Sequence, residues 1–399
     1  MGYRQAEKNK NKFSLLKLMR KIKKNLIRTR YTLNTIDEIV DHILSESDNY
    51  IDLDECKINH LFDFRIILSR LKEDVKFRDK INIRNDINEF GFEVFYCILK
   101  IPLRCETTVF TKGAFFELIE FEKYVQFIGA VFESEYSFQK SVFHSSVNLS
   151  TVDFETTISS KHDLSFYRTI FKKDVSFFMT HFHNTANFRS AIFHEGLDIN
   201  YAEFTNIDLS NIEMKGDAML INYHTAIFLQ VNNRETGLYL KQHALKMQDS
   251  VNVLYFKKLE MEAYRKTLLT RPPEMEIPAI KRKINNIKIQ SDLLILWLSK
   301  WSNSYGNSFL LGILFTLTVW FIFFSWFIVM RDGIGSTFIW TDKRYLYEAV
   351  NYIWLFNGIG GLSVNNSVTW GCIFPFFIGK IFITFGIYQT IVAFRKYSK

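Results

Sequence analysis

The sequence predicts a β-solenoid followed by a long helix and a hairpin of two apolar helices. Two observations carry this prediction. Large apolar residues, mostly phenylalanine, recur through the middle of the chain at alternating steps of five and six residues. Near the C-terminus, two stretches of more than twenty residues are almost entirely apolar. An internal repeat of this length decides the architecture before any local argument.

The stagger of five and six excludes a regular helix or a single strand as the repeating unit. Five residues along a helix rotate a side chain by roughly 140°, so successive phenylalanines would face different sides. In a plain strand, side chains face inward at every second residue. A wall that changes direction every five or six residues sends one large side chain inward each time, as in a β-solenoid. The predicted core consists of the phenylalanines that keep the stagger, which are Phe116, Phe121, Phe127, Phe132, Phe138, Phe143, Phe154, Phe171, Phe177, Phe182, Phe188, Phe193 and Phe204.

The residues two positions before these phenylalanines support the same interpretation. In an extended segment they share the inward face with the phenylalanine, and most of them are small or β-branched. Examples are Ala130, Ser141, Val152, Thr180 and Ala191. An interior crowded by stacked rings requires such side chains.

One interruption divides the repeat. The gap from Phe154 to Phe171 is seventeen residues, which equals steps of six, five and six, so we expect the phase to survive it. On that register Ser165 stands where a core residue belongs, while Phe166 is one position off. We therefore predict a bulge or short loop near residues 156–168.

The repeating units resemble those of the pentapeptide-repeat family. The matching segments are AVFESEYSF (130–138), SVFHSSVNL (141–149), ANFRSAIF (186–193) and AEFTNIDL (202–209). The resemblance covers about a third of the chain and implies a right-handed quadrilateral β-helix over residues 94–215. It implies no particular activity, because such solenoids serve many unrelated functions.

A basic arm at residues 1–30 precedes the solenoid. It holds eleven Lys or Arg and one acidic residue, whereas the whole chain has a net charge of +8. Its basic side chains line one side of an amphipathic helix and include Lys17, Arg20, Lys21, Lys23 and Lys24. Two interpretations stay open, a helix on the anionic inner leaflet or a solvated helix that caps the solenoid. Residues 31–93 are expected to form a helical cap region.

A long linker helix is expected at residues 234–270, where apolar positions alternate with charge. The Arg-Pro-Pro sequence at 271–273 then breaks it. The segment NRETGLYLKQHALKMQ and the ending YQTIVAFRKY resemble segments of membrane-anchored members of the pentapeptide-repeat family. A short interfacial helix at 291–303 is expected to lead into the first apolar segment.

The chain ends in two segments of membrane-spanning length. Residues 308–330 carry no charge, and residues 370–394 are interrupted by Pro375 and Lys380. Each is long enough to cross the hydrocarbon core of a bilayer as a transmembrane helix. Residues 1–12 are polar and basic, and basic residues flank both spans. We therefore expect a multi-pass protein of the bacterial inner (cytoplasmic) membrane with both termini in the cytosol.

Residues 345–366, between the two spans, have the pattern of a re-entrant loop or of a surface loop. An amphipathic stretch leads into a glycine-rich run that includes Gly358, Gly360, Gly361 and Ser363. Backbone enters a membrane only where protein or water surrounds it. The re-entrant interpretation therefore makes these residues candidates for a pore.

Lys380 is the most informative single residue of the second span. A cation near mid-bilayer costs roughly 2.5–3.5 kcal/mol and faces a partner, a cavity or a pore. Two interpretations follow for this intramembrane site. Lys380 either faces the axis of an oligomer, or it snorkels to the interface or pairs within the hairpin, for which Glu348 and Asp342 are candidate partners.

No pattern of catalytic or metal-binding residues stands out. His181 and His183 flank the inward Phe182, so both are expected on the outer surface, and two histidines alone make a weak metal site. The four cysteines lack metal-type spacing and predict no disulfide framework. The predicted core is hydrocarbon, without the polar pair that acid–base catalysis needs. We expect neither an enzyme nor a bound cofactor or metal.

The leading functional hypothesis is a membrane-anchored protein whose cytosolic β-helix is a recognition or assembly module for an unidentified protein ligand. Its hairpins could assemble as a homo-oligomer into a two-span ion channel or pore. The alternatives are a membrane-tethered scaffold without transport and a DNA-mimicking topoisomerase inhibitor. Residues 94–214 hold fifteen acidic against ten basic residues, which is a mild excess for an imitation of duplex DNA. Nucleic acid is therefore not an expected partner.

Overall fold

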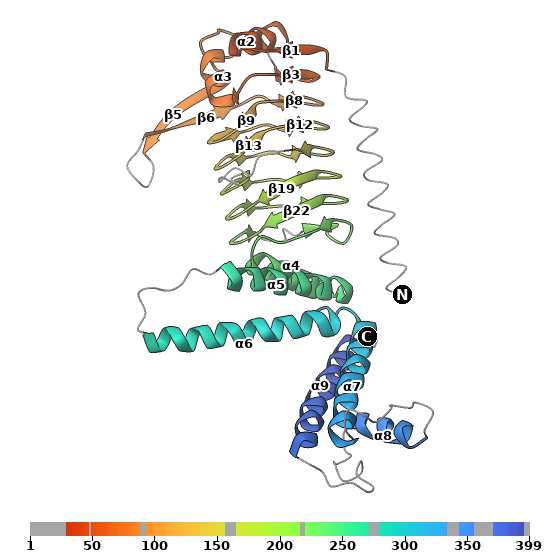
Figure 1. Ribbon diagram of the computed structural model, residues 1–399. Helices are drawn as coiled ribbons and strands as arrows, with labels where there is room; N and C mark the ends of the chain where they lie inside the picture. Colours follow the sequence, from red (N-terminus) through yellow and green to blue (C-terminus); the bar gives the residue numbers. More distant parts are fainter. Residues whose placement is uncertain are drawn as a thin grey trace. The chain divides into compact units, whose positions relative to one another are not determined.

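The computed structural model describes residues 29–47, 49–87, 93–155, 165–215, 220–270, 279–332, 343–354 and 370–394. The chain divides into two compact units, Met1–Thr236 and Gly237–Lys399. The first unit contains a β-solenoid of eight coils, and the second is helical (Figure 1).

Four sheets run along the solenoid and form its walls. The longest sheet contains β1 (Tyr31–Leu33), β3 (Cys56–Ile58), β8 (Val109–Phe110), β12 (Val131–Phe132), β16 (Asp153–Phe154), β19 (His181–Asn187), β22 (Glu203–Asp208) and β25 (Ile227–Phe228). The second contains β2 (Ile51–Asp52), β7 (Leu103–Arg104), β11 (Val125–Gln126), β15 (Val147–Asn148), β18 (Val175–Ser176), β21 (Leu197–Asp198) and β24 (Leu220–Ile221). The third contains β5 (Ile81–Ile87), β6 (Glu93–Leu99), β10 (Ile119–Phe121), β14 (Val142–Phe143), β17 (Ile170–Phe171), β20 (Ile192–Phe193) and β23 (Glu213–Met214). The short fourth sheet contains β4 (Phe62–Asp63), β9 (Gly113–Phe115) and β13 (Glu135–Ser137).

The core of the solenoid is a set of stacked aromatic columns, as the stagger predicts. All thirteen predicted core phenylalanines are buried, each with at most 1% of its surface exposed. Rings one coil apart lie nearly parallel, as in the pair Phe121 and Phe143, with centroids 4.8 Å apart and planes 2° apart. Burial of each such side chain contributes about 1.5–3 kcal/mol. The β-solenoid prediction is therefore confirmed.

The small residues two positions before the phenylalanines also point inward, and the polar ones among them are hydrogen-bonded. The Ser141 hydroxyl donates to the carbonyl of Phe116 (2.5 Å), and the Thr180 hydroxyl donates to the carbonyl of Leu149 (2.5 Å). Both acceptors belong to the preceding coil, so each hydroxyl links two coils. A buried hydroxyl without such an acceptor would carry an uncompensated desolvation cost.

The interruption of the repeat does not preserve the phase. A coil of twenty-two residues would place Phe171 on Leu149, whereas β17 pairs with β14 and Phe171 stacks on Phe143. The reason is that Phe166 takes the core position expected for Ser165, with its ring 5.1 Å from that of Phe138. The coil between Phe143 and Phe171 is thus six residues longer than a coil of twenty-two residues. Most of the predicted bulge at 156–168 falls outside the described residues.

The solenoid also extends beyond the predicted range of 94–215, from β1 to β25. The expected cap region does contain two helices, α2 (Ile36–Ser45) and α3 (Phe64–Leu71), but β1 to β4 lie between and beside them and join the solenoid sheets. Helix α2, helix α3 and strand β5 are inserted between wall strands, and β5 pairs in an antiparallel manner with the wall strand β6. These insertions break the spacing from which the repeat was recognised.

The second unit begins with helices that differ from the expected pattern. The linker predicted at 234–270 is two helices, α4 (Arg234–Lys246) and α5 (Ser250–Thr270). Gln248 adopts a left-handed backbone (φ 55°), and the Asp249 carboxylate accepts the amide of Asn252 (3.1 Å), so one helix ends and the next is capped there. Helix α6 (Ala279–Asn303) begins before the expected interfacial helix at 291–303.

Two helices of the second unit are long and apolar enough to cross a membrane. They are α7 (Phe309–Asp332) and α9 (Trp370–Phe394), and they pack side by side. A Cβ atom added at Gly312 would lie 2.6 Å from the Thr390 hydroxyl, and Gly386 faces Thr316 with similarly little space. Small residues at such contacts let two apolar helices approach closely.

Candidate functional site

Helix α8 (Lys343–Ile353) packs against the α7–α9 hairpin. Ala349 and Tyr352 are buried with aromatic residues of both long helices. The indole of Trp320 donates to the carbonyl of Ala349 (2.9 Å), and the Tyr352 hydroxyl donates to the carbonyl of Pro375 (2.8 Å). The two hydrogen bonds join α8 to the helices before and after it in the chain, across 29 and 23 residues.

These contacts place α8 beside the apolar part of the hairpin rather than beyond its end. Trp320 precedes the end of α7 at Asp332 by twelve residues, which corresponds to about 18 Å along the helix axis. Pro375 follows the start of α9 by five residues, or about 8 Å. The first part of the predicted loop at 345–366 is therefore a helix at membrane depth if α7 and α9 span the bilayer.

A buried ion pair holds α8 to the end of α7. Arg331 Nη1 lies 2.9 Å from Glu348 Oε2, and only 5% and 2% of the two side chains are exposed. The expectation that Glu348 pairs with Lys380 is therefore wrong. Arg331 reaches Glu348 because α8 lies against the last turns of α7, which the sequence pattern does not show.

Lys380 binds the end of α8 instead. Its ammonium group donates to the main-chain carbonyl of Trp354 and lies 5.3 Å from the ring centroid of Phe376 and 5.7 Å from that of Tyr352. A cation at this position satisfies a terminal carbonyl and complements the negative end of the helix dipole. Asp342, Gly358, Gly360, Gly361 and Ser363, also predicted for this site, lie outside the described residues, as do the basic residues from Lys17 to Lys24.

The outward face of α8 is apolar. Leu346, Tyr347, Val350 and Trp354 each expose between 47% and 68% of their surface. An amphipathic helix at an aqueous surface would present polar side chains there. The distribution fits a helix surrounded by lipid or by another apolar protein surface.

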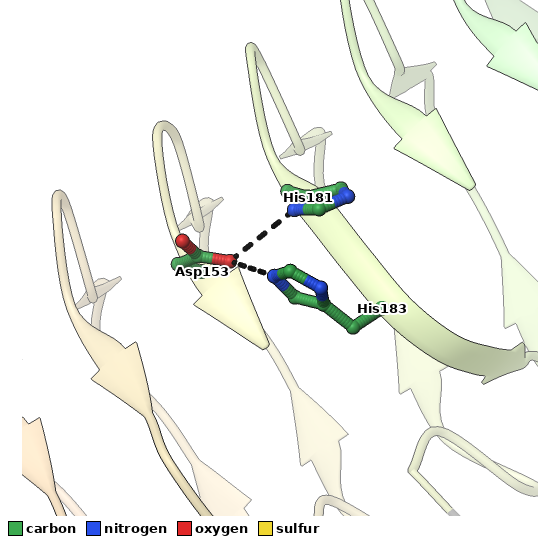
Figure 2. Close-up of side chains that lie close together, drawn as sticks. All are labelled: Asp153, His181 and His183. Carbon is green, nitrogen blue, oxygen red and sulfur yellow. Dashed lines mark hydrogen bonds and ion pairs between the residues drawn. The ribbon is translucent and has the colours of Figure 1, made fainter. Parts of the chain in front are cut away.

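A second cluster lies on the longest wall of the solenoid, where β16 pairs in parallel with β19 (Figure 2). Asp153 is the register partner of His181. Its Oδ1 atom lies 3.4 Å from Nδ1 of His181 and 3.0 Å from Nε2 of His183. The two imidazole rings are 3.8 Å apart. His183 is exposed, as expected, but His181 is 93% buried, so the expectation of two surface histidines is wrong for His181.

The electrostatics of this cluster centre on the carboxylate. Burial alone would raise the pKa of Asp153, but hydrogen bonds and charge interactions with His181 and His183 outweigh it and hold that pKa well below its usual range. On the other side of His181, Nε2 lies 3.9 Å from Oε1 of the buried Glu203. The wall thus holds a ladder of carboxylate, imidazole and carboxylate over three successive coils.

Sequence reasoning missed Asp153 because it assumed coils of constant length. A coil of twenty-two residues would place residue 159 beside His181, whereas the observed register places Asp153 there. Recognition of Phe166 as the core residue would have supplied the correct register. The sequence therefore contains a signal for the correct register, but it consists of one phenylalanine that is one position off the expected repeat.

A shallow groove of about 640 Å³ runs along the second wall. Polar side chains from successive coils line much of it, including Ser146, Asn148, Ser176 and Asp198. Gly196 leaves no room for a side chain in the groove, because a Cβ atom there would lie 2.3 Å from Cδ1 of Ile221 and 3.0 Å from the carboxylate of Asp174. The groove is therefore a concave surface with a mixed polar and apolar lining.

Comparison with family models, with curated proteins and with solved structures yields no match to this chain. The relation to the pentapeptide-repeat family therefore remains a prediction from the sequence.

Proposed function

We propose that this protein is a membrane-anchored recognition or assembly module. Helices α7 and α9 anchor it in a bacterial inner membrane, and the walls of the solenoid bind a protein ligand on the cytosolic side. The solenoid interior is filled by side chains, so binding belongs to its outer surface, which carries the groove and the Asp153 cluster.

The position of α8 is the observation that carries the membrane part of this proposal. A short helix with a buried ion pair on one face and exposed apolar residues on the other is poorly suited to water. The last carbonyls of any helix lack intrahelical partners, and Lys380 supplies one donor to α8. Polar groups of this kind are tolerated within a bilayer where protein surrounds them.

A test of this arrangement uses a single introduced cysteine. The four native cysteines are buried, so Val350→Cys on the outward face of α8 can be compared with Tyr124→Cys on a solenoid wall. Membranes opened by freeze–thaw give a membrane-impermeant maleimide access to both surfaces. We expect rapid labelling of Tyr124→Cys and protection of Val350→Cys until detergent is added. Equal labelling rates before detergent would contradict a membrane-embedded α8.

An oligomeric pore is a second candidate function, favoured by the combination of two spans and a half-length helix between them. Channel subunits with these elements surround an axis, and the outward apolar face of α8 offers a surface for a second copy. Native mass spectrometry in detergent should then show a defined oligomer, and Lys380→Met should change ion selectivity in planar bilayers. A strict monomer would exclude the pore and leave a membrane-tethered scaffold.

A further inference from the structure

We propose that Asp153, His181 and His183 form a binding site for a divalent late transition-metal ion such as Zn²⁺ on the outer wall of the solenoid. The proposal does not depend on the membrane anchor. It rests on the way in which two coils of the solenoid bring three ligand atoms to one point (Figure 2).

The backbone builds the site from two segments that are nearly thirty residues apart. Parallel pairing of β16 with β19 places the Asp153 carboxylate beside the imidazole of His181. Between Phe182 and Thr185, β19 carries one residue more than β22 opposite it, which marks a bulge at His183. Bulges commonly re-aim a side chain, and Nε2 of His183 points at the same carboxylate oxygen as His181 does.

Two of the three spacings between the ligand atoms are close to those of tetrahedral coordination. Zinc–nitrogen and zinc–oxygen bonds are about 2.0–2.2 Å long, so two ligand atoms on one tetrahedral ion lie about 3.3 Å apart. The carboxylate oxygen lies 3.4 Å and 3.0 Å from the two imidazole nitrogens. All three ligand atoms lie within 4.8 Å of one another, so an ion could be accommodated by small side-chain rotations.

The surroundings of His181 also fit a metal ligand. A histidine that binds a metal through one ring nitrogen usually directs the other toward a carboxylate, which orients the ring and increases its basicity. His181 directs Nδ1 toward the Asp153 carboxylate, and its Nε2 lies 3.9 Å from the carboxylate of Glu203. Glu203 is 3% exposed and lies on the next coil, where it is fixed by the pairing of β19 with β22.

The donor set indicates the class of ion. Two imidazoles and one carboxylate suit Zn²⁺, Co²⁺ or Ni²⁺, whereas Mg²⁺ and Ca²⁺ prefer sites made of oxygen ligands alone. Three protein ligands leave a fourth position for water. The His183 side chain is 42% exposed, so the site is open to solvent and an ion can enter without unfolding.

The experiment is a metal titration of the full-length, untagged protein in detergent after treatment with a chelator. Isothermal titration with Zn²⁺ measures affinity and stoichiometry, and the visible absorption of Co²⁺ reports tetrahedral geometry. His183→Ala removes one ligand from an exposed position, and Asp153→Asn weakens another. His144→Ala is the matched control, because His144 is a wall histidine that contacts the carboxylate of Glu120 (2.7 Å) and belongs to no cluster of three metal-ligating residues among those that the structure describes.

We expect one Zn²⁺ ion per chain in the wild type and in His144→Ala, with a tetrahedral Co²⁺ spectrum. His183→Ala should weaken binding at least tenfold and abolish that spectrum, with an unchanged circular dichroism spectrum, and Asp153→Asn should weaken it as well. A hundredfold excess of Mg²⁺ or Ca²⁺ should not compete. Absence of saturable binding, or equal affinity in the wild type and His183→Ala, would show that the trio is only a hydrogen-bonded cluster and overturn the proposal.

Discussion

The ring of Phe171 stacks on the ring of Phe143, with 5.3 Å between centroids and 5° between planes. The two residues are twenty-eight positions apart, whereas rings in the preceding coils are stacked at intervals of twenty-two. One coil of the solenoid thus contains six extra residues, yet the core rings of successive coils still stack at a similar distance. Phe166 makes this possible, because it completes the column that runs through Phe138 and Phe188.

Replacement of Phe166 by alanine should therefore destabilise the solenoid strongly. Its side chain is fully buried and stacks on Phe138 at 5.1 Å and on Phe188 at 4.9 Å. Loss of such a side chain costs about 3–5 kcal/mol. Phe178→Ala, at a half-buried position outside the core, is the control and should cost clearly less. Thermal unfolding followed by circular dichroism makes the comparison, and equal losses would contradict the register.

The Asp54 carboxyl should weaken the solenoid at neutral pH. Burial, with a smaller contribution from Asp52, raises its pKa from 3.8 to about 6, although the amide of Glu106 and Arg104 act in the opposite direction. Because the folded-state pKa is the higher one, this group favours folding below about pH 4, and the contribution is lost as the pH rises through 6. Solvent screens part of this effect, so the cost at pH 7.5 is below about 3 kcal/mol.

Asp54→Asn tests this prediction, since its amide oxygen can still accept the hydrogen bond from the Glu106 amide (2.6 Å). The variant should unfold at a higher temperature than the wild type at pH 7.5, and the difference should shrink toward pH 4. Asp79→Asn, at an exposed position, should have no such effect. A variant that is less stable than the wild type at pH 7.5 would refute the prediction.

Removal of one partner of the Arg331–Glu348 pair should lower the stability of the protein more than removal of both partners does. Either Arg331→Met or Glu348→Met leaves a buried charge without its ion-pair partner, which costs about 3–5 kcal/mol. The double variant replaces two charges by apolar side chains and should recover most of that loss. Thermal stability in detergent is the measurement, and additive losses in the double variant would show that the pair does not hold α8 in place.

Gly237→Ala should separate α4 from α5 despite the higher helix propensity of alanine. A Cβ atom at residue 237 would lie 2.6 Å from the Cα atom of Glu260. The two helices must then move apart, which breaks the contact between Lys241 and the buried Glu260 (2.5 Å). Helix propensity alone predicts a gain of about 1 kcal/mol. We therefore expect Gly237→Ala to lower the melting temperature. An increase would show that helix propensity outweighs the crowding between α4 and α5.

The helical part of the chain shows which features a local sequence pattern can predict and which it cannot. The absence of charge over residues 308–330 predicted α7, because a long apolar segment needs no partner in order to be recognised. Pairing within the hairpin was one of the open interpretations of Lys380, but a main-chain carbonyl was not among the partners considered. A main-chain carbonyl such as that of Trp354 carries no sequence signal, and an ion pair such as Arg331 with Glu348 depends on where α8 lies against α7.

By itself, the sequence determined the inward direction of each phenylalanine and therefore the β-solenoid. Steps of five and six residues are a local pattern, and each step marks the point where the chain turns from one wall to the next. It also determined the two apolar helices. Only the tertiary structure decided which coil stacks on which, and so placed Asp153 rather than residue 159 beside His181. The physical reason is that strand pairing depends on the total length between two segments, and six added residues shift every later contact by one wall.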